Sequence, residues 1–183
     1  MLARLFALVI LLLPSALVAE DWAALEQPGA IALMRHALAP GGGDPAEFTL
    51  GDCSTQRNLD SRGRAQARQI GAALRARGIG FDRIWSSAWC RAEETARLLA
   101  LGPVEIRPAL NSFFAGRGDR ASQTRDTLAD LSALPEAANA LLVTHQVNIT
   151  ALTGVTPQSG EIIIVQRRAD GRLEVTGRVN IAP

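Results

Sequence analysis

The 183-residue sequence contains no lysine and no tyrosine, and its 19 basic residues are therefore all arginines. The absence of lysine excludes a lysine nucleophile, a Schiff base and the lysine of a P-loop. Two cysteines and two histidines are too few for a four-ligand Cys/His zinc site without added carboxylates. A formal net charge of +1 argues against a nucleic-acid-binding surface. The length and a hydrophobic content of 48% suit one domain with a sizeable core.

Residues 1–19 have the pattern of a secretory signal peptide. One arginine precedes an unbroken apolar run from Leu5 to Leu13, and Ala19 precedes an acidic pair. The run is shorter than the ~20 apolar residues that a membrane-spanning helix needs. We expect cleavage after Ala19, a single domain over residues 20–183, no membrane span after cleavage, and a periplasmic or secreted location. An uncleaved N-terminal anchor is the alternative.

The expected location bears on the redox state of the two cysteines, Cys53 and Cys90. In an oxidising compartment an even pair can form a disulfide, which would stabilise the fold by about 3–4 kcal/mol in the chain-entropy model. A disulfide needs Cα atoms ~4.4–6.8 Å apart, which a sequence does not show. A disulfide and two independent core residues therefore both remain open.

Short apolar segments alternate with amphipathic segments along the rest of the chain. The expected strands cover residues 31–34, 81–86, 104–107, 140–144, 161–166 and 173–179, and the expected helices cover 62–77, 88–101, 121–134 and 147–152. Ser61 is expected to cap the first of these helices. The alternation predicts an α/β fold, a three-layer sandwich with a mostly parallel central sheet and helices on both faces. In such sheets ligands bind beyond the carboxyl ends of the strands.

Both histidines stand directly after an expected strand, at that edge. His36 follows IALMR, His145 follows ALLVT, Arg35 precedes the first histidine, and Arg91 lies in the first turns of a helix. We therefore expect two guanidinium groups, two imidazoles and a helix N-terminus to meet. One arginine can bind two oxygens of a phosphate group through two parallel hydrogen bonds, and a neutral imidazole can act as a nucleophile. Because the arginines would supply the charge stabilisation, the pattern predicts a phosphoryl-transfer site with no metal.

Other interpretations of these residues remain open. A histidine at a strand end is more often a structural hydrogen-bonding group, and Arg91 could be a surface residue whose stem covers the core. A two-histidine metal hydrolase is disfavoured by the adjacent arginine charges. The main rival is a non-catalytic module that binds phosphate or a phosphosugar.

Four segments resemble motifs of the histidine phosphatase superfamily, which includes the phosphoglycerate mutases and many phosphatases. LMRHALAPG resembles its Arg-His-Gly signature, NLDSRGRAQARQIGAAL and IWSSAWCRAEETARLL resemble two of its helical segments, and LLVTH resembles its second-histidine strand. The resemblance covers roughly residues 30–165. It implies a phosphoglycerate mutase-like fold, no cofactor, and a small phosphorylated substrate.

The resemblance also implies a role for individual residues. His36 would be the nucleophile that becomes phosphohistidine, Arg35 and Arg91 would hold the phosphoryl oxygens, and His145 would complete the pocket. An alcohol would leave first, and water would then release phosphate, so the chain would be a metal-independent phosphomonoesterase. Ala37 stands where the family has glycine, a change that fits if the backbone dihedrals permit a methyl group.

The proton donor of the family is missing from its two usual places. Ser112 stands where mutase-like members have glutamate, and Gln146 stands where another branch has an acid. Glu161, at the start of a late strand, could enter the pocket from the same edge, but an exposed strand-end carboxylate explains it equally well. Asp119, in the loop AGRGDR, is a second candidate, although an ordinary loop residue explains it better. A missing acid costs typically ~10²–10⁴-fold on a poor leaving group and far less on a phenol, an acyl phosphate or a phosphohistidine.

The connection over residues 37–58 is long and rich in glycine and proline, and we expect it to form part of the substrate wall. Arg57 and Asn58 are candidate substrate contacts, although a loop arginine and a turn asparagine explain them equally well. Trp89 is expected either to stack on a substrate ring or to pack under this loop. The sequence predicts neither the physiological substrate nor the oligomeric state.

Overall fold

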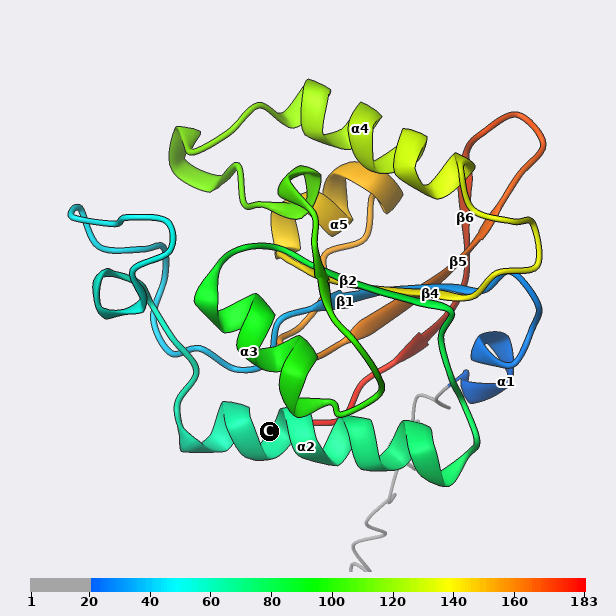
Figure 1. The fold of residues 1–183 in the computed structure, drawn as a ribbon, viewed down its shortest axis with the longest axis horizontal. Coiled ribbons are helices and arrows are strands. Elements are labelled where there is room, and N and C mark those ends of the chain that lie inside the picture. Colours follow the sequence, from blue (N-terminus) through cyan, green and yellow to red (C-terminus); the bar gives the residue numbers. More distant parts are fainter. Residues whose placement is uncertain (1–20) are drawn as a thin grey trace, which may run out of the picture.

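The computed structural model describes residues 21–183 and folds them around one six-stranded sheet (Figure 1). The strand order is β3-β2-β4-β1-β5-β6. The strands are β1 (Ile31–Arg35), β2 (Arg83–Ser86), β3 (Glu105–Ile106), β4 (Ala140–Thr144), β5 (Ile162–Arg167) and β6 (Leu173–Val179). The first four strands run parallel, whereas β5 and β6 are antiparallel to their neighbours. The predicted, mostly parallel sheet is confirmed, and the predicted signal peptide lies outside the described residues.

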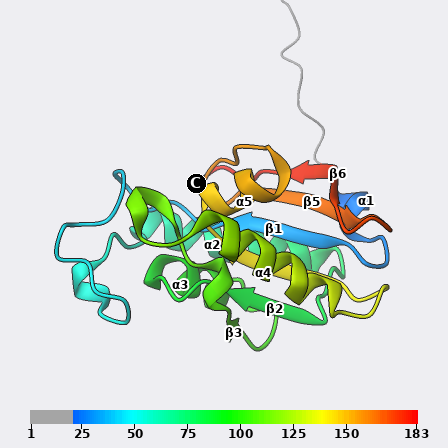
Figure 2. The ribbon, with the colours of Figure 1, turned by 90° about the horizontal axis from the view of Figure 1, so that it is seen from above.

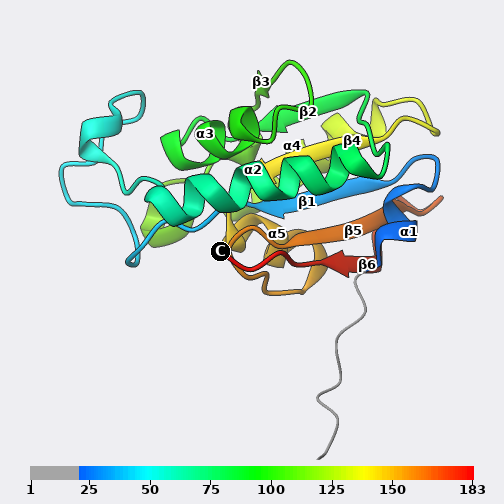
Figure 3. The ribbon, with the colours of Figure 1, turned by 90° about the horizontal axis from the view of Figure 1, so that it is seen from below.

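Helices cover both faces of the sheet, which confirms the predicted three-layer sandwich. They are α1 (Trp22–Leu25), α2 (Ser61–Ala76), α3 (Cys90–Leu98), α4 (Arg120–Ser132) and α5 (Gln146–Thr153). Figure 3 shows α2 and α3 on one face, and Figure 2 shows α4 and α5 on the other. No helix among residues 21–183 has the length and apolar character needed to cross a bilayer.

The central strands are apolar on both sides because each side faces a helical layer. In β1, Ala32 and Met34 join the core beneath α2 and α3, whereas Ile31 and Leu33 join the core beneath α4 and α5. All four side chains are fully buried. A continuous apolar run of this kind is typical of a parallel strand covered on both faces.

The start of a helix differs from the sequence prediction where an aspartate caps the helix N-terminus. Asp60, not Ser61, caps α2, because its carboxylate accepts a hydrogen bond from the N–H of Gly63 at 2.7 Å. Gly63 itself is required by packing, since a Cβ there would lie 1.9 Å from the carbonyl oxygen of Leu38. This close approach packs the start of α2 against the chain that leaves β1, at the carboxyl edge of the parallel strands, where ligands bind in sheets of this kind.

Candidate active site

The structure brings together the four strand-end residues that the sequence singles out. Arg35 ends β1, and His36 and His145 directly follow β1 and β4, which are adjacent and parallel. The N–H of His36 donates to the carbonyl oxygen of Thr144 at 3.0 Å, and the two imidazole centroids lie 5.5 Å apart. Arg91 enters from the first turn of α3, and its Nε–H donates to Nε2 of His36 at 3.2 Å.

The hydrogen bonds of His36 define its tautomer. Nδ1 lies 2.8 Å from the carbonyl oxygen of Ala37, which can only accept, so Nδ1 carries the proton. Nε2 therefore holds a lone pair and accepts the hydrogen bond from Arg91. Burial first, and the charge of Arg91 second, hold the pKa of His36 well below 6.5. The result is a neutral imidazole with its free lone pair beside a guanidinium group, as a nucleophile requires.

The methyl group of Ala37, the departure from the family signature, fits without backbone strain. Ala37 is fully buried and is not among the described residues with a positive φ. Its N–H donates to Oγ1 of Thr95 at 3.1 Å. The turn after β1 therefore does not require glycine here.

His145 is also neutral, with its proton on the nitrogen that faces away from Arg91. Its Nδ1 lies 3.4 Å from Nη2 of Arg91, which can only donate. Its Nε2–H therefore donates to Oγ of Ser87 at 2.9 Å, and that hydroxyl donates onward to Oδ1 of Asn111 at 3.2 Å. Burial, followed by the influence of His36 and Arg91, holds the pKa of His145 well below 6.5.

Arg91 has all five of its N–H donors engaged. Nη1 and Nη2 bind the two carboxylate oxygens of Asp44 at 2.6 and 3.2 Å, and Nη1 also donates to the carbonyl oxygen of Arg57 at 3.3 Å. Nε–H and the remaining Nη2–H point to His36 and His145. The Asp44–Arg91 pair is buried, with 5% and 3% of the two side chains exposed.

Asp44 is the residue that sequence reasoning missed. Attention to polar residues at strand ends and helix starts overlooks a carboxylate in the run GGGDP. The available signal was the presence of acids inside the loop that the sequence already predicts as substrate wall, although Glu47 and Asp52 share that signal with Asp44.

Two further arginines face the same space. Arg35 donates from Nη1 to the carbonyl oxygen of Pro157 at 3.0 Å, while its buried Nε has no hydrogen-bond partner. Arg57 donates from Nε to the carbonyl oxygen of Gly43 at 2.7 Å and from Nη1 to that of Ala39. Burial first, and Arg91 second, lower the pKa of Arg57 to about 10.

These residues line a pocket of about 160 Å³. Its walls come from the strand ends, the glycine loop, the segment after β3 and the start of α5: Arg35, His36, Gly41, Gly42, Gly43, Arg57, Arg91, Ser112, Phe114, His145, Gln146 and Val147. No carboxylate is among these described lining residues. The pocket therefore offers an anion three guanidinium groups, but it offers a leaving group only neutral donors such as Ser112 and Gln146.

Glu161 does not line this pocket, so the geometry gives no support to the expectation that it enters from the same edge as the proton donor. Its side chain is buried just before β5 with both oxygens engaged. Oε1 accepts from Nε of Arg178 at 2.8 Å, and Oε2 accepts from the N–H of Gln158 at 2.6 Å. Glu161 therefore braces the connection between α5 and β5.

Asp119 and Asn58 also lie outside the pocket lining. The exposed Asp119 caps α4, and its carboxylate accepts from the N–H of Ser122 at 2.6 Å. The amide of Asn58 donates to the carbonyl oxygens of Cys53 and Gln56, at 2.6 and 3.1 Å. The sequence expectations of an acid at Asp119 and a substrate contact at Asn58 thus have no geometric support, whereas Arg57 does face the pocket.

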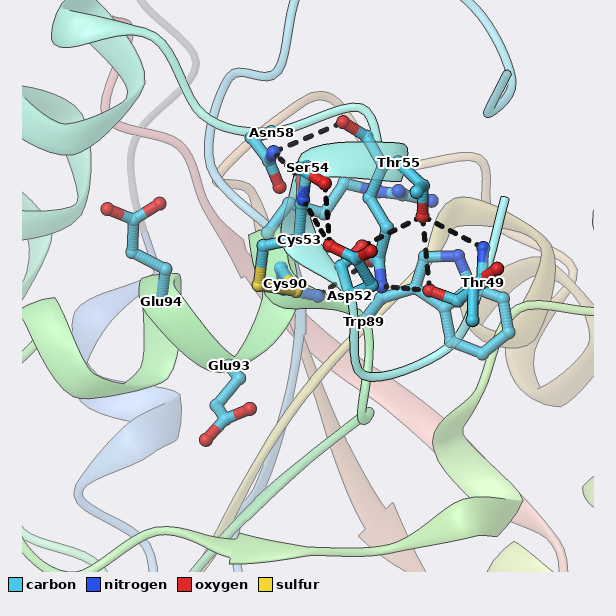
Figure 4. Close-up of a disulfide and its surroundings, with 12 residues drawn as sticks. Thr49, Asp52, Cys53, Ser54, Thr55, Asn58, Trp89, Cys90, Glu93 and Glu94 are labelled. Carbon is cyan, nitrogen blue, oxygen red and sulfur yellow. Dashed lines mark hydrogen bonds between the residues drawn. A yellow bond between two sulfur atoms is a disulfide. The ribbon is translucent and has the colours of Figure 1, made fainter. Parts of the chain in front are cut away.

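A disulfide joins Cys53 to Cys90, with Cα atoms 5.7 Å apart, and so decides the question that the sequence left open (Figure 4). It ties the loop after β1 to the residue next to Arg91. Trp89 packs under this loop, stacked on Phe48 with centroids 4.9 Å apart, and its Nε1–H donates to Asp44 at 3.1 Å. The loop and the start of α3 thus form one cross-linked unit.

The family model of the histidine phosphatase superfamily (branch 1) matches residues 31–124, just over half of the chain. A comparison with curated proteins finds no match. The matched segment carries Arg35, His36 and Arg91, and the strand with His145 lies beyond it.

Similar solved structures share the fold at low sequence identity. The protein histidine phosphatase SixA, complexed with tungstate, is 20% identical over 81% of this chain and 95% of that chain, with a TM-score of 0.58. Mycobacterial glucosyl-3-phosphoglycerate phosphatase is 18% identical over 82% and 98%, with a TM-score of 0.61. A phosphoserine phosphatase from Entamoeba histolytica is 17% identical over 81% and 95%, with a TM-score of 0.60. The chain therefore belongs to the histidine phosphatase superfamily, as its four motifs predict.

Proposed function

We propose that this histidine phosphatase is a metal-independent phosphomonoesterase that acts through a phosphohistidine on Nε2 of His36. The observation that carries the proposal is the unprotonated Nε2, held in a pocket with three arginines and a second neutral imidazole. Three arginines against the single carboxylate of Asp44 leave two positive charges, which match the dianion of a phosphomonoester.

The reaction then needs two in-line displacements at phosphorus. In the first, the lone pair of His36 Nε2 forms the N–P bond while the P–O ester bond breaks and its electron pair leaves with the substrate oxygen. The Nδ1–H bond to Ala37 stabilises the positive charge that develops on the imidazole. In the second, water attacks phosphorus, the N–P bond breaks, and its electron pair returns to Nε2 as phosphate leaves.

The lack of a carboxylate among the described lining residues supports a restricted class of substrates. We propose phosphoryl donors whose leaving group departs with little protonation, such as aryl phosphates, acyl phosphates and phosphohistidine. One of the similar structures, SixA, is described as a protein histidine phosphatase. Arg57 is the proposed contact for the rest of the substrate, because its guanidinium group faces the pocket without a carboxylate of its own.

A two-histidine metal hydrolase is the weaker hypothesis. Arg91 donates to the facing nitrogens of both His36 and His145. The lone pairs that would have to bind a metal ion therefore already accept hydrogen bonds from a positively charged guanidinium group. A non-catalytic phosphate-binding module is the stronger rival, because the pocket lacks an acid.

The test is turnover of an aryl phosphate with chelator present, measured beside His36→Ala. The proposal predicts that chelator has no effect, that vanadate inhibits, and that His36→Ala loses at least about 10³-fold of kcat. An acid-labile phosphoryl group on the peptide containing His36 would identify the intermediate. Loss of activity with chelator would support the metal hydrolase, whereas a folded, phosphate-binding wild type without turnover would support the binding module.

We also propose that the protein works in the periplasm or outside the cell. The leader-like residues 1–19 and the Cys53–Cys90 disulfide, which oxidising compartments favour, support this location. Expression of the whole chain in a bacterial host, followed by mass spectrometry, is expected to give a mature protein that begins at Glu20. An intact N-terminus in the membrane fraction would instead support an uncleaved anchor.

A further inference from the structure

The guanidinium group of Arg91 is divided between two sets of partners that differ in strength. On its Nη end, Asp44 accepts two charge-assisted hydrogen bonds at 2.6 and 3.2 Å. On the edge formed by Nε and Nη2, the histidines accept at 3.2 and 3.4 Å, which are the longer contacts. That edge faces the pocket, and it has the two-donor geometry that a phosphoryl group binds.

Asp44 is itself fixed on every side that the structure describes. Its Oδ2 accepts from Nε1–H of the buried Trp89 at 3.1 Å, and its Oδ1 accepts from the backbone N–H of Arg57 at 3.2 Å. The disulfide between Cys53 and Cys90 holds the same loop to the start of α3. A carboxylate with this many donors keeps one orientation, so it can impose that orientation on its partner.

We propose that Asp44 is a positioning residue, which occupies the Nη end of Arg91 so that the Nε–Nη2 edge stays aimed at the phosphoryl group on His36. The inference rests on the proposed phosphoryl transfer and adds a residue that no motif of the sequence assigns. As the phosphoryl group arrives, its oxygens replace the two histidine nitrogens on that edge while the Asp44 contacts remain.

Two other roles for Asp44 agree less well with the geometry. A proton donor must be protonated and must face the leaving group. Burial by itself would raise the pKa of Asp44, but hydrogen bonds and charge from Arg91 hold it below its ordinary value, and Asp44 is not among the pocket-lining residues. A built-in blocker would occupy the edge that faces His36, whereas Asp44 occupies the opposite end of the guanidinium group.

The experiment compares Asp44→Asn with Asp52→Asn in the same loop. Asp52 is a matched control, because it caps a turn through Ser54 at 3.0 Å and does not contact Arg91. For Asp44→Asn we expect kcat to fall about 10- to 100-fold on aryl and alkyl phosphates alike, with the inhibition constant of inorganic phosphate unchanged or lower. Asp52→Asn should keep the wild-type kcat. A general loss of structure would weaken phosphate binding together with kcat.

Two results would overturn the inference. A loss confined to alkyl phosphates would make Asp44 the proton donor, and a gain in kcat/KM would make it a blocker. Should Asp44→Asn fail to fold, Trp89→Phe removes the Nε1–H bond to Oδ2, along with part of the ring that stacks on Phe48, and it should lower kcat two- to fivefold without weakening phosphate binding. An unchanged kcat in folded Trp89→Phe would then count against positioning.

A nuclear magnetic resonance measurement separates this inference from the proposed function. The Nε–H signal of Arg91, assigned by its loss in Arg91→Lys, should exchange slowly in the wild type and at least tenfold faster in Asp44→Asn. Unchanged exchange would overturn the positioning role even in an active enzyme. Accelerated exchange in a protein without turnover would keep the positioning role and reject only the phosphatase.

Discussion

The active site has two halves that are built in different ways. The strand-end half, defined by Arg35, His36 and His145, is fixed by the sheet, since parallel pairing of β1 with β4 sets where each side chain leaves the backbone. The loop half, defined by Asp44 and Arg57, is fixed by side chains that bind backbone carbonyls and by one disulfide. The proposed nucleophile thus lies on the rigid scaffold, while the residues proposed to orient it and to contact the substrate lie on the connection.

Two arginine–carboxylate pairs make the same contrast at the level of single residues. Asp44 and Arg91 are both buried, with 5% and 3% exposure, and Nε of Arg91 donates to Nε2 of His36, the proposed nucleophile. Glu161 is equally buried at 4%, but its partner Arg178 is 47% exposed and lies on the last strand. Both are buried acids beside an arginine, so only the location of the arginine separates an active-site role from a structural one.

The largest effect on activity is expected in the strand-end half. His145→Asn should lower kcat about 10²–10³-fold on aryl phosphates, because it removes a preorganised partner of the transferred group and leaves the Nη2 edge of Arg91 without its acceptor. Steady-state kinetics, with melting temperature as the control for folding, measures the effect. A fall of less than fivefold would show that His145 acts only as a structural link to Ser87.

Loss of the disulfide should lower the stability of the protein and loosen the loop half more than the strand-end half. Replacing both Cys53 and Cys90 with serine should cost about 3–4 kcal/mol in the chain-entropy model, since the bridge spans 37 residues. Urea unfolding with and without reductant measures the loss, and reductant should have no effect on the double variant. Activity at low temperature should show both a higher KM and a lower kcat, because Arg57 and Asp44 loosen together with the loop half while β1 and β4 stay paired. Unchanged KM and kcat in the folded double variant would contradict this division.

The same division explains what the sequence could predict. The strands β1, β4 and β6 follow from apolar runs and turn residues, and the two histidines follow because a polar residue interrupts a buried strand at a defined edge. Asp44 has no such periodic signal, since its place depends on the path of a glycine-rich loop. The expectation for Glu161 fails for a physical reason as well. The sequence predicts the two strands that become β5 and β6, but their exact register, which includes a shift between Ile164 and Val165 and brings Arg178 to Glu161, does not follow from local patterns.

Helix starts are the other feature that local patterns left uncertain. Ser61 and Asp60 are both good capping residues, and only the path of the chain into α2 decides that the carboxylate takes that role. Asp119 shows the same competition, because a carboxylate in a loop can cap a helix or face a pocket. Such choices depend on tertiary contacts and thus on the whole fold.

A smaller effect is expected from pH, and it tests the neutral histidines. In the unfolded chain each histidine takes a proton near pH 6.5, whereas burial holds the native pKa of His36 and His145 well below that value. Below pH 6.5 the unfolded state therefore binds more protons, and the free energy of unfolding should fall by up to about 1.4 kcal/mol per pH unit for each histidine. Urea unfolding between pH 5 and 7.5 checks this, and His145→Asn should show roughly half the slope. A flat profile would contradict neutral native histidines.

The smallest effect on activity is expected at Glu161, and it is the sharpest test of the comparison. Glu161→Gln should leave kcat within about twofold on aryl and alkyl phosphates, because Glu161 is not among the pocket-lining residues and both its oxygens are bound elsewhere, to Arg178 and Gln158. Stability should fall by about 1–2 kcal/mol, less than a fully buried pair would lose, since Arg178 is half exposed. Arg178→Gln is the matched control and should reproduce both results. A selective loss on alkyl phosphates in Glu161→Gln alone would make Glu161 a proton donor and place a carboxylate in the strand-end half after all.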